Sequence, residues 1–202
     1  MSDGPALIGL TGGVAAGKSE TLRVLSELGA DTLSTDAVVH ELLAGDEVAE
    51  LLIERWGDAV RAEGGGLDRA SIAGVVFGEP EELQWLESVL HPRVGARVVE
   101  WREGLSGDLE VAVIEVPLLF EGNMAPIFDA TIAVVADDAV RTERAVARGT
   151  GELEGRNSRQ LSQDEKAALA TFVVRNDGDL GALERQLTEL WPKLVASRAQ
   201  RG

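Results

Sequence analysis

The sequence predicts an α/β fold in which a parallel sheet of five strands lies between two layers of helices. Five apolar runs have strand length, and helical patterns separate them along the chain. A glycine-rich motif stands between the first run and the first helix, and a long helical stretch follows the second run. The apolar runs are residues 6–10, 31–34, 111–116, 130–135 and 172–175, of which the second and the last are the weaker.

The first apolar run leads into Gly12–Ser19, which reads G-G-V-A-A-G-K-S and fits the P-loop pattern G-x-x-x-x-G-K-[ST] at every fixed position. Apolar residues then recur at helical spacing until Gly29 closes the pattern. Strand, loop and helix therefore come in the order that phosphate binding requires. A chance match in a glycine-rich turn is the alternative, and both flanks argue against it. We expect a nucleoside triphosphate site.

Within this motif, glycines let backbone N–H groups turn towards anionic oxygens. Lys18 can reach the β- and γ-phosphates and is a candidate catalytic residue, while the Ser19 hydroxyl can ligate Mg²⁺. The candidate nucleotide-binding residues here are Gly12, Gly13, Val14, Ala15, Ala16, Gly17, Lys18, Ser19 and the adjacent Glu20.

Asp36 follows the second apolar run, at the sheet edge where ligands gather in open α/β folds. Its carboxylate could accept a proton from a hydroxyl substrate or help to hold Mg²⁺. It could equally cap the helix that begins at Ala37, a position that Asp favours. The residue's position alone leaves both interpretations open.

The stretch between the second and third strands looks helical and is too long for a simple crossover. His40–Trp56 forms one helical pattern, and acidic residues open another at 79–82, which Pro92 is expected to interrupt. A helical subdomain that closes over a second substrate fits this stretch. His91, before Pro92, could be a buried histidine, a substrate contact or a helix-end cap.

Glu115 ends the third strand as the acidic residue of a Walker-B strand does. It could bind Mg²⁺ through a water molecule, whereas the apolar residues after Pro117 fit packing. Further on, Gly149–Gly155 contains three glycines and has little to bury, so it is either a lid or an ordinary surface loop.

Three arginines precede this glycine-rich loop at positions that share one helix face, and they are Arg141, Arg144 and Arg148. Surface arginines are usually solvated, but a cluster in an acidic protein can focus an anionic ligand. Because guanidinium groups bind two phosphate oxygens at once, phosphate contact is the favoured interpretation.

The composition limits the remaining possibilities. A formal charge of −16 argues against a nucleic-acid partner, and without cysteine there is no disulfide or thiolate metal site. Two histidines do not support a His-based zinc site. No basic leader and no apolar run of about 18 residues is present, so we expect no membrane partner and a cytoplasmic location. Oligomeric state is not encoded in any pattern, and a monomer is the default expectation.

Taken together, these segments resemble the dephospho-CoA kinase family over nearly the whole chain. The matching segments are 10–14, 27–30, Asp36, 40–43, 67–69, 76–77, 86–87, His91-Pro92 and Glu115-Val116-Pro117-Leu118-Leu119-Phe120-Glu121. Near the end, Arg148, Arg156, Gln160 and Asn176 fall where the family has the same residue types. The P-loop is shared by many proteins, so the His-Pro and Pro-Leu-Leu-Phe-Glu segments make the resemblance selective.

The resemblance implies transfer of a phosphoryl group from ATP, with Mg²⁺, to the ribose 3′-hydroxyl of dephospho-CoA, the last step of coenzyme A synthesis. Asp36 would be the base. Acceptor-binding residues would be Arg69, His91, Pro92, Leu118, Leu119 and Glu121. Arg148 and Asn176 would join the ATP site, and Arg144 and Arg156 would belong to the lid.

On this basis we expect a single P-loop kinase domain spanning residues 1–202. Its core would be residues 1–36, 108–147 and 161–202, the CoA-side helical insertion 37–107 and the lid 148–160. The chain departs from the family in three places: Ser34 replaces the first of two acidic residues, Glu20 replaces a Thr, and the lid is shorter by a few residues.

Two other functions remain as alternatives. Another small-molecule P-loop kinase, acting on a nucleoside monophosphate or a metabolite hydroxyl, would share every feature except the acceptor insertion. A nucleotide-dependent switch without an acceptor is the second alternative. The chain has no Asn-Lys pair and hence no guanine-reading Asn-Lys-x-Asp element, and a switch has little use for an acceptor subdomain.

Overall fold

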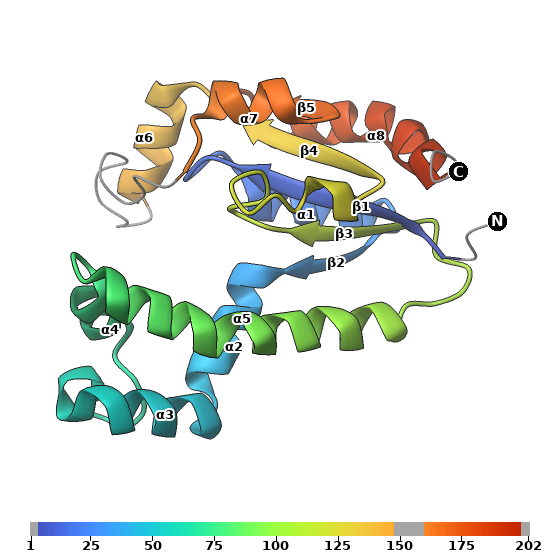
Figure 1. Ribbon diagram of the computed structural model, residues 1–202. Helices are drawn as coiled ribbons and strands as arrows, with labels where there is room; N and C mark the ends of the chain where they lie inside the picture. The colour runs from blue at the N-terminus through green and yellow to red at the C-terminus, as the bar shows by residue number, and fades with distance from the viewer. Residues whose placement is uncertain (1–3, 148–159, 199–202) are drawn as a thin grey trace. The chain divides into compact units, whose positions relative to one another are not determined.

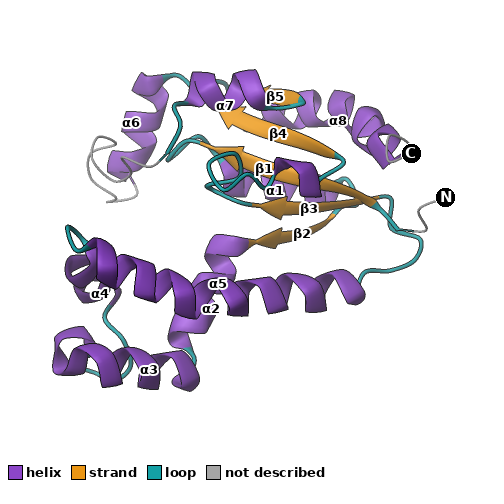
Figure 2. Cartoon of the chain, in the orientation of Figure 1, coloured by secondary structure: helices purple, strands orange, loops and turns teal. Residues whose placement is uncertain are grey.

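A computed structural model describes residues 4–147 and 160–198, and the chain divides into two compact units. The first unit comprises Met1–Ser34 and Leu105–Gly202, and the second comprises Thr35–Gly104. In the described part of the chain, strands occur only in the first unit, as the orange arrows of Figure 2 show. Residues 148–159 of the predicted lid, with Arg148 and Arg156, lie outside the described residues.

The first unit is built on a parallel sheet of five strands in the order β2-β3-β1-β4-β5 (Figure 1). The strands are β1 (Ala6–Gly12), β2 (Asp31–Ser34), β3 (Val111–Glu115), β4 (Ala130–Val135) and β5 (Phe172–Arg175). Every strand pair is parallel. The predicted α/β class and the five predicted strands are confirmed, and β1, which leads into the P-loop, is the central strand.

Helices cover one face of this sheet through a shared apolar core. Helix α1 (Lys18–Glu27) and helix α8 (Leu180–Ser197) pack leucine and valine side chains against alternate residues of the strands. This alternation follows from the two-residue period of a strand, which sends every second side chain to the same face. The P-loop is therefore carried by a strand and a helix that are both fixed in the core.

The opposite face is covered by helix α7 (Gln163–Leu169) and by the segment that follows β3. A Cβ at Gly9 of β1 would lie 2.6 Å from the Leu119 side chain and 2.8 Å from that of Phe128, so this segment packs directly on the central strand. The unit also contains the short 3₁₀ helix η2 (Ala125–Ile127) and helix α6 (Asp138–Ala147).

The second unit consists of helices around its own small core. They are α2 (Thr35–Ala44), α3 (Asp46–Trp56), the 3₁₀ helix η1 (Gly57–Val60), α4 (Arg69–Val76) and α5 (Pro80–Glu103). The buried apolar residues at the centre are Val48, Leu52, Val60, Ile72, Leu86 and Leu90. An isolated antiparallel bridge joins Arg61 and Leu67.

Two expected helix boundaries in this unit are wrong. The pattern at 40–56 forms two helices, because Gly45 adopts an extended backbone with ψ 144° between them. Helix α5 continues through Pro92, although proline removes one backbone hydrogen bond. Leu86 and Leu90 lie in the core before that position, and their burial helps to offset the local cost. None of the described helices is long and apolar enough to cross a membrane.

Candidate functional site

The P-loop joins the end of β1 to the start of α1 in a conformation that requires glycine at position 17. Gly17 has φ 101°, and a Cβ there would lie 2.0 Å from Asn176 Nδ2. A Cβ at Gly12 would lie 2.4 Å from the backbone oxygen of Val134. At both positions a neighbouring atom leaves no room for a side chain, and the turn of the loop also favours glycine. Helix α1 begins at Lys18, so its N-terminus faces the loop.

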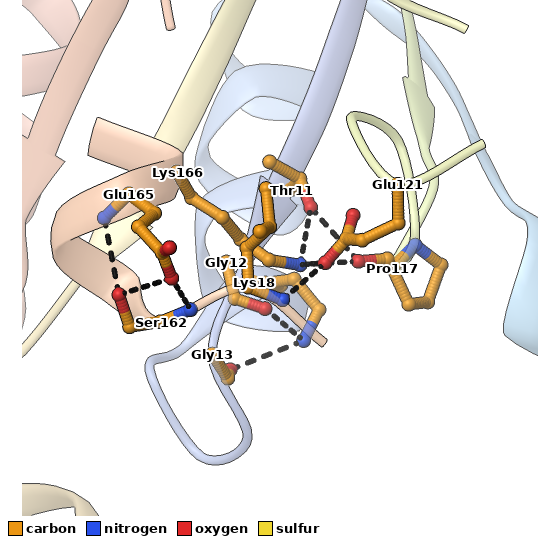
Figure 3. A network of polar contacts seen from close by, with 10 residues as sticks. Thr11, Gly12, Gly13, Lys18, Pro117, Glu121, Ser162, Glu165 and Lys166 are labelled. Carbon is orange, nitrogen blue, oxygen red and sulfur yellow. Dashed lines mark hydrogen bonds and ion pairs between the residues drawn. The ribbon is translucent and has the colours of Figure 1, made fainter. Parts of the chain in front are cut away.

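The Lys18 ammonium is held at the centre of the loop (Figure 3). Its Nζ donates to the backbone oxygens of Gly12 and Gly13, each at 3.3 Å. The same atom lies 3.9 Å from Oε1 of Glu115, a carboxylate at the end of β3 that is 4% exposed. Ser34 Oγ donates to the other oxygen of Glu115 at 2.6 Å. The predicted phosphate-binding lysine and the Walker-B-like carboxylate therefore lie side by side.

The other side of the loop is fixed by residues from far along the chain. Asn176 Nδ2 donates to the Ala16 backbone oxygen at 2.9 Å, and Arg144 Nη1 donates to the Asn176 backbone oxygen at 2.9 Å. Arg141 Nε donates to the backbone oxygen of Val14 at 3.0 Å. Two of the three arginines predicted to share a face thus support the P-loop and are half-buried rather than solvated.

A hollow of about 210 Å³ lies beside the first turn of α1. Four residues named in the sequence analysis line it, and they are Gly17, Glu20, Arg144 and Asn176. Gly178, Leu180 and Leu183 complete the lining. The lining therefore combines polar side chains with two leucines, next to the phosphate loop.

The metal-binding prediction depends on oxygen ligands close to the loop. Among the described residues no group of three or more His, Cys, Asp or Glu side chains could hold a metal ion by itself. Ser19 is exposed in the first turn of α1, and Glu115 is a buried carboxylate next to Lys18. A hydroxyl and a carboxylate suit Mg²⁺ that takes most of its other ligands from phosphate and water.

Three of the six predicted acceptor-binding residues, together with the candidate base Asp36, belong to the helical unit and are exposed. Asp36 lies in the first turn of α2, inside the helix rather than before it, and Arg69 is the first residue of α4 after its cap Asp68. His91 and Pro92 are exposed on α5. Two interpretations of His91 are thereby excluded, because the side chain is not buried and helix α5 continues past it to Glu103.

The remaining acceptor candidates lie in the first unit, directly after β3. Leu118 is half-buried and Leu119 is 0% exposed. Glu121 Oε1 accepts from the backbone N–H of Leu161 at 2.8 Å and lies 3.1 Å from Lys166 Nζ. Burial would raise the pKa of the Glu121 carboxyl. The backbone N–H groups of Glu121 and Leu161, together with the Lys166 ammonium, outweigh that effect and hold the pKa below its usual range.

Sequence reasoning missed Lys166, which is 0% exposed. Its Nζ donates to the Pro117 backbone oxygen at 2.5 Å and lies 3.4 Å from Thr11 Oγ1 (Figure 3). Gln163 was also missed, although its amide bonds both the N–H and the carbonyl of Ala136, the residue after β4. One signal was available: Lys166 is one of only three lysines in a strongly acidic chain.

Comparison with known proteins agrees with this geometry. A model of the dephospho-CoA kinase family matches residues 6–182. The dephospho-CoA kinase of Streptomyces avermitilis is 36% identical over 199 residues, covering 96% of this chain and 97% of the relative. That of Deinococcus radiodurans is 40% identical over 187 residues, covering 91% of this chain and 89% of the relative.

Solved structures give the same result for the fold. The protein TT1252 from Thermus thermophilus superimposes with a TM-score of 0.80 at 34% identity, covering 95% of this chain and 98% of that one. The dephospho-CoA kinase from Campylobacter jejuni gives a TM-score of 0.63 at 20% identity over 94% of this chain and 97% of that one, which supports the fold alone. Since the family model matches most of the sequence and the curated relatives align over nearly their full length, the chain belongs to the dephospho-CoA kinase family.

Proposed function

We propose that this kinase transfers the γ-phosphoryl group of ATP to the ribose 3′-hydroxyl of dephospho-CoA, giving coenzyme A and ADP. Family membership supports ATP as donor and dephospho-CoA as acceptor. The observation that carries the proposal is the Lys18 ammonium, held by two loop carbonyls next to the buried carboxylate of Glu115. A cation fixed in this way can meet the negative charge of a triphosphate without rearranging the loop.

On the nucleotide side, the P-loop residues 12–19 would bind the phosphates, and the hollow beside α1 would take the nucleoside. Glu20, Arg144 and Asn176 line that hollow. Arg148 and Arg156 are proposed to act from the lid at 148–160. Mg²⁺ would be held by Ser19 and, through water, by Glu115; when bound, it would neutralise charge on the phosphate oxygens.

In the transfer step the ribose oxygen forms a bond to the γ-phosphorus while the bond to the β–γ bridging oxygen breaks and ADP leaves. Asp36 is proposed to orient the hydroxyl and to accept its proton, and Lys18 to stabilise the charge on the transferring group. Because the transition state of phosphoryl transfer is loose, orientation of the hydroxyl contributes more than full deprotonation.

The acceptor is proposed to be bound by the helical insertion 37–107, through Arg69, His91 and Pro92, and by the turn after β3. In that turn Leu118 is half-buried and can contact a ligand, whereas Leu119 packs in the core. Residues 1–202 would then act as one kinase domain, with core segments 1–36, 108–147 and 161–202. We expect a monomer in the cytoplasm, without nucleic-acid or membrane partners.

The experiment that tests this proposal measures ADP release from ATP and Mg²⁺ across a panel of acceptors. Dephospho-CoA should stimulate release well above the rate with water alone, and AMP, another nucleoside monophosphate and shikimate should not. Stimulation by one of those instead would favour a different small-molecule kinase. Slow hydrolysis that no acceptor stimulates would favour a nucleotide-dependent switch.

A further inference from the structure

Lys166 is a buried cation on α7 whose ammonium contacts two other segments of the first unit, the end of β1 and the turn after β3. Its ammonium donates to the Pro117 backbone oxygen at 2.5 Å, lies 3.4 Å from Thr11 Oγ1 and pairs with Glu121 Oε1 at 3.1 Å (Figure 3). Thr11 Oγ1 in turn donates to the same Pro117 oxygen at 3.1 Å. The lysine side chain is 0% exposed, so this network is closed to solvent on the Lys166 side.

Both contacted segments border the proposed reaction site. Thr11 immediately precedes Gly12 of the P-loop, and Pro117 and Glu121 bound the turn after β3. Lys166 itself lies on α7, whose start is fixed by a reciprocal capping box between Ser162 and Glu165. One ammonium thus connects a capped helix to the base of the P-loop and to the turn proposed to bind the acceptor.

A buried ion pair is a costly way to gain stability, because apolar side chains of similar volume often stabilise a core equally well. Unlike an apolar side chain, a buried lysine also donates directional hydrogen bonds. Two of the partners of Lys166 are uncharged oxygens, Thr11 Oγ1 and the Pro117 backbone oxygen. The neutral partners are therefore the contacts that an apolar replacement would lose whatever happened to the charge of Glu121.

We propose that Lys166 is a positioning residue for phosphoryl transfer, holding the 117–121 turn at the end of β1 so that the acceptor is correctly placed. This inference rests on the proposed function. Lys166 is proposed to act through Pro117 and Glu121 rather than by touching either substrate.

The effect should fall on the acceptor rather than on ATP, because the P-loop has supports of its own. Asn176 holds the Ala16 carbonyl, and Arg141 holds that of Val14. The 117–121 turn has local backbone bonds, such as that from the Gly122 N–H to the Leu118 oxygen, but those bonds move with it. Among the described residues, the hydrogen bonds from Lys166 Nζ and Thr11 Oγ1 tie the Pro117 carbonyl to the rest of the unit.

The test compares Lys166→Met and the double variant Lys166→Met/Glu121→Gln with the single variant Glu121→Gln, because Glu121 is itself an acceptor-binding candidate. Lys166→Met alone leaves the Glu121 carboxylate without its ammonium and should lower the melting temperature, whereas the double variant removes both charges and should recover much of it. Lys193→Met, on the exposed face of α8, is the matched control. Melting temperature, kcat and KM for dephospho-CoA, and affinity for a non-hydrolysable ATP analogue are measured on each protein.

We expect the double variant to have a kcat/KM for dephospho-CoA about 10- to 100-fold below that of Glu121→Gln alone, with nucleotide affinity nearly unchanged. A stable double variant with the same kcat/KM as Glu121→Gln would show that Lys166 only neutralises Glu121 and would overturn the proposal. An equal loss of nucleotide affinity, or failure of both Lys166 variants to fold, would also overturn it. If wild type itself does not phosphorylate dephospho-CoA, the proposed function fails first, which separates the two conclusions.

Discussion

The Lys18 ammonium lies where two P-loop carbonyls and the carboxylate of Glu115 converge. Replacing it by alanine removes a preorganised charge that faces the transferring phosphoryl group. We expect Lys18→Ala to lower kcat by about 10²-fold or more while the protein stays folded. Steady-state kinetics with circular dichroism tests this, with Lys193→Ala as control. Near-normal turnover of a folded Lys18→Ala protein would contradict the P-loop assignment.

Asp36 presents a choice between a chemical and a structural role. As a base it should be sensitive to loss of charge, so Asp36→Asn should lower kcat by about 10²- to 10⁴-fold with ATP affinity nearly unchanged. As a first-turn residue of α2 it would only complement the helix dipole, which is worth about 0.3–1 kcal/mol. Kinetics and thermal unfolding on the same variant separate the two roles. Wild-type turnover would remove Asp36 from the mechanism.

The sequence predicted the roles of residues that act within one contiguous motif, but not the roles of residues that act through contacts with distant parts of the chain. Gly17 and Lys18 follow from a contiguous motif whose chemistry needs that order. By contrast, the contacts of Lys166 with Thr11 and of Asn176 with Ala16 join residues 155 and 160 positions apart. No periodicity encodes such pairings, and only the tertiary fold reveals them. The partial burial of Arg141 could not be predicted either, because helical spacing shows which residues share a helix face but not which part of the protein covers that face.

The conformation of the loop between β1 and α1 depends on Gly17. Gly17→Ala would place a Cβ 2.0 Å from Asn176 Nδ2 in a residue with φ 101°. Gly78 is a matched control, because it has φ 85° but no heavy atom within 4 Å of the added Cβ. Both variants should lose about 1–3 kcal/mol of unfolding free energy from backbone strain. Gly17→Ala should lose more and also bind ATP less tightly.

Chemical denaturation measures the first effect, and titration with an ATP analogue measures the second. Equal destabilisation of the two glycine variants, with ATP binding intact in both, would mean that the contact with Asn176 does not constrain the loop.

The turn after β3 has a pH dependence that follows from Glu121. Because the pKa of this carboxyl is lowered in the folded protein, its ionised form stabilises the fold above the unfolded pKa, near 4.3. That stabilisation is lost as the pH falls through the lower, folded pKa. Unfolding free energies from urea titrations should therefore show wild type more stable than Glu121→Gln at pH 7. The difference should shrink below about pH 4. A difference that stays constant down to pH 3 would contradict this assignment.

Secondary structure was predictable where packing reinforces the local pattern. The three inner strands β1, β3 and β4 follow from clear apolar runs because they are buried along their whole length, whereas the more exposed edge strands β2 and β5 correspond to the two weaker runs. The helix boundaries in 40–56 and at Pro92 were not predicted correctly. The apolar periodicity continues across Gly45, although the backbone there separates two helices. Helix α5 continues through Pro92, where burial of neighbouring side chains helps to offset the cost of a proline inside a helix. The lid at 148–160 stays a prediction.

Across the entire chain, an acidic protein with a net charge of −16 is proposed to bind two anionic substrates. Local placement of its few cations resolves this apparent conflict. Lys18, Arg141 and Arg144 all contact the P-loop or the Asn176 that supports it. A focused positive site on a negative surface attracts an anion at short range.

In the proposed reaction the γ-phosphoryl group of ATP ends on the ribose 3′-oxygen of dephospho-CoA. The most direct test is ³¹P and ¹H NMR of the product formed from ATP, Mg²⁺ and dephospho-CoA, with its mass measured in parallel. We predict one added phosphate, coupled to the ribose 3′ proton, and one ADP released for each. A phosphate on any other hydroxyl, or ADP release without a phosphorylated acceptor, would contradict the proposed reaction.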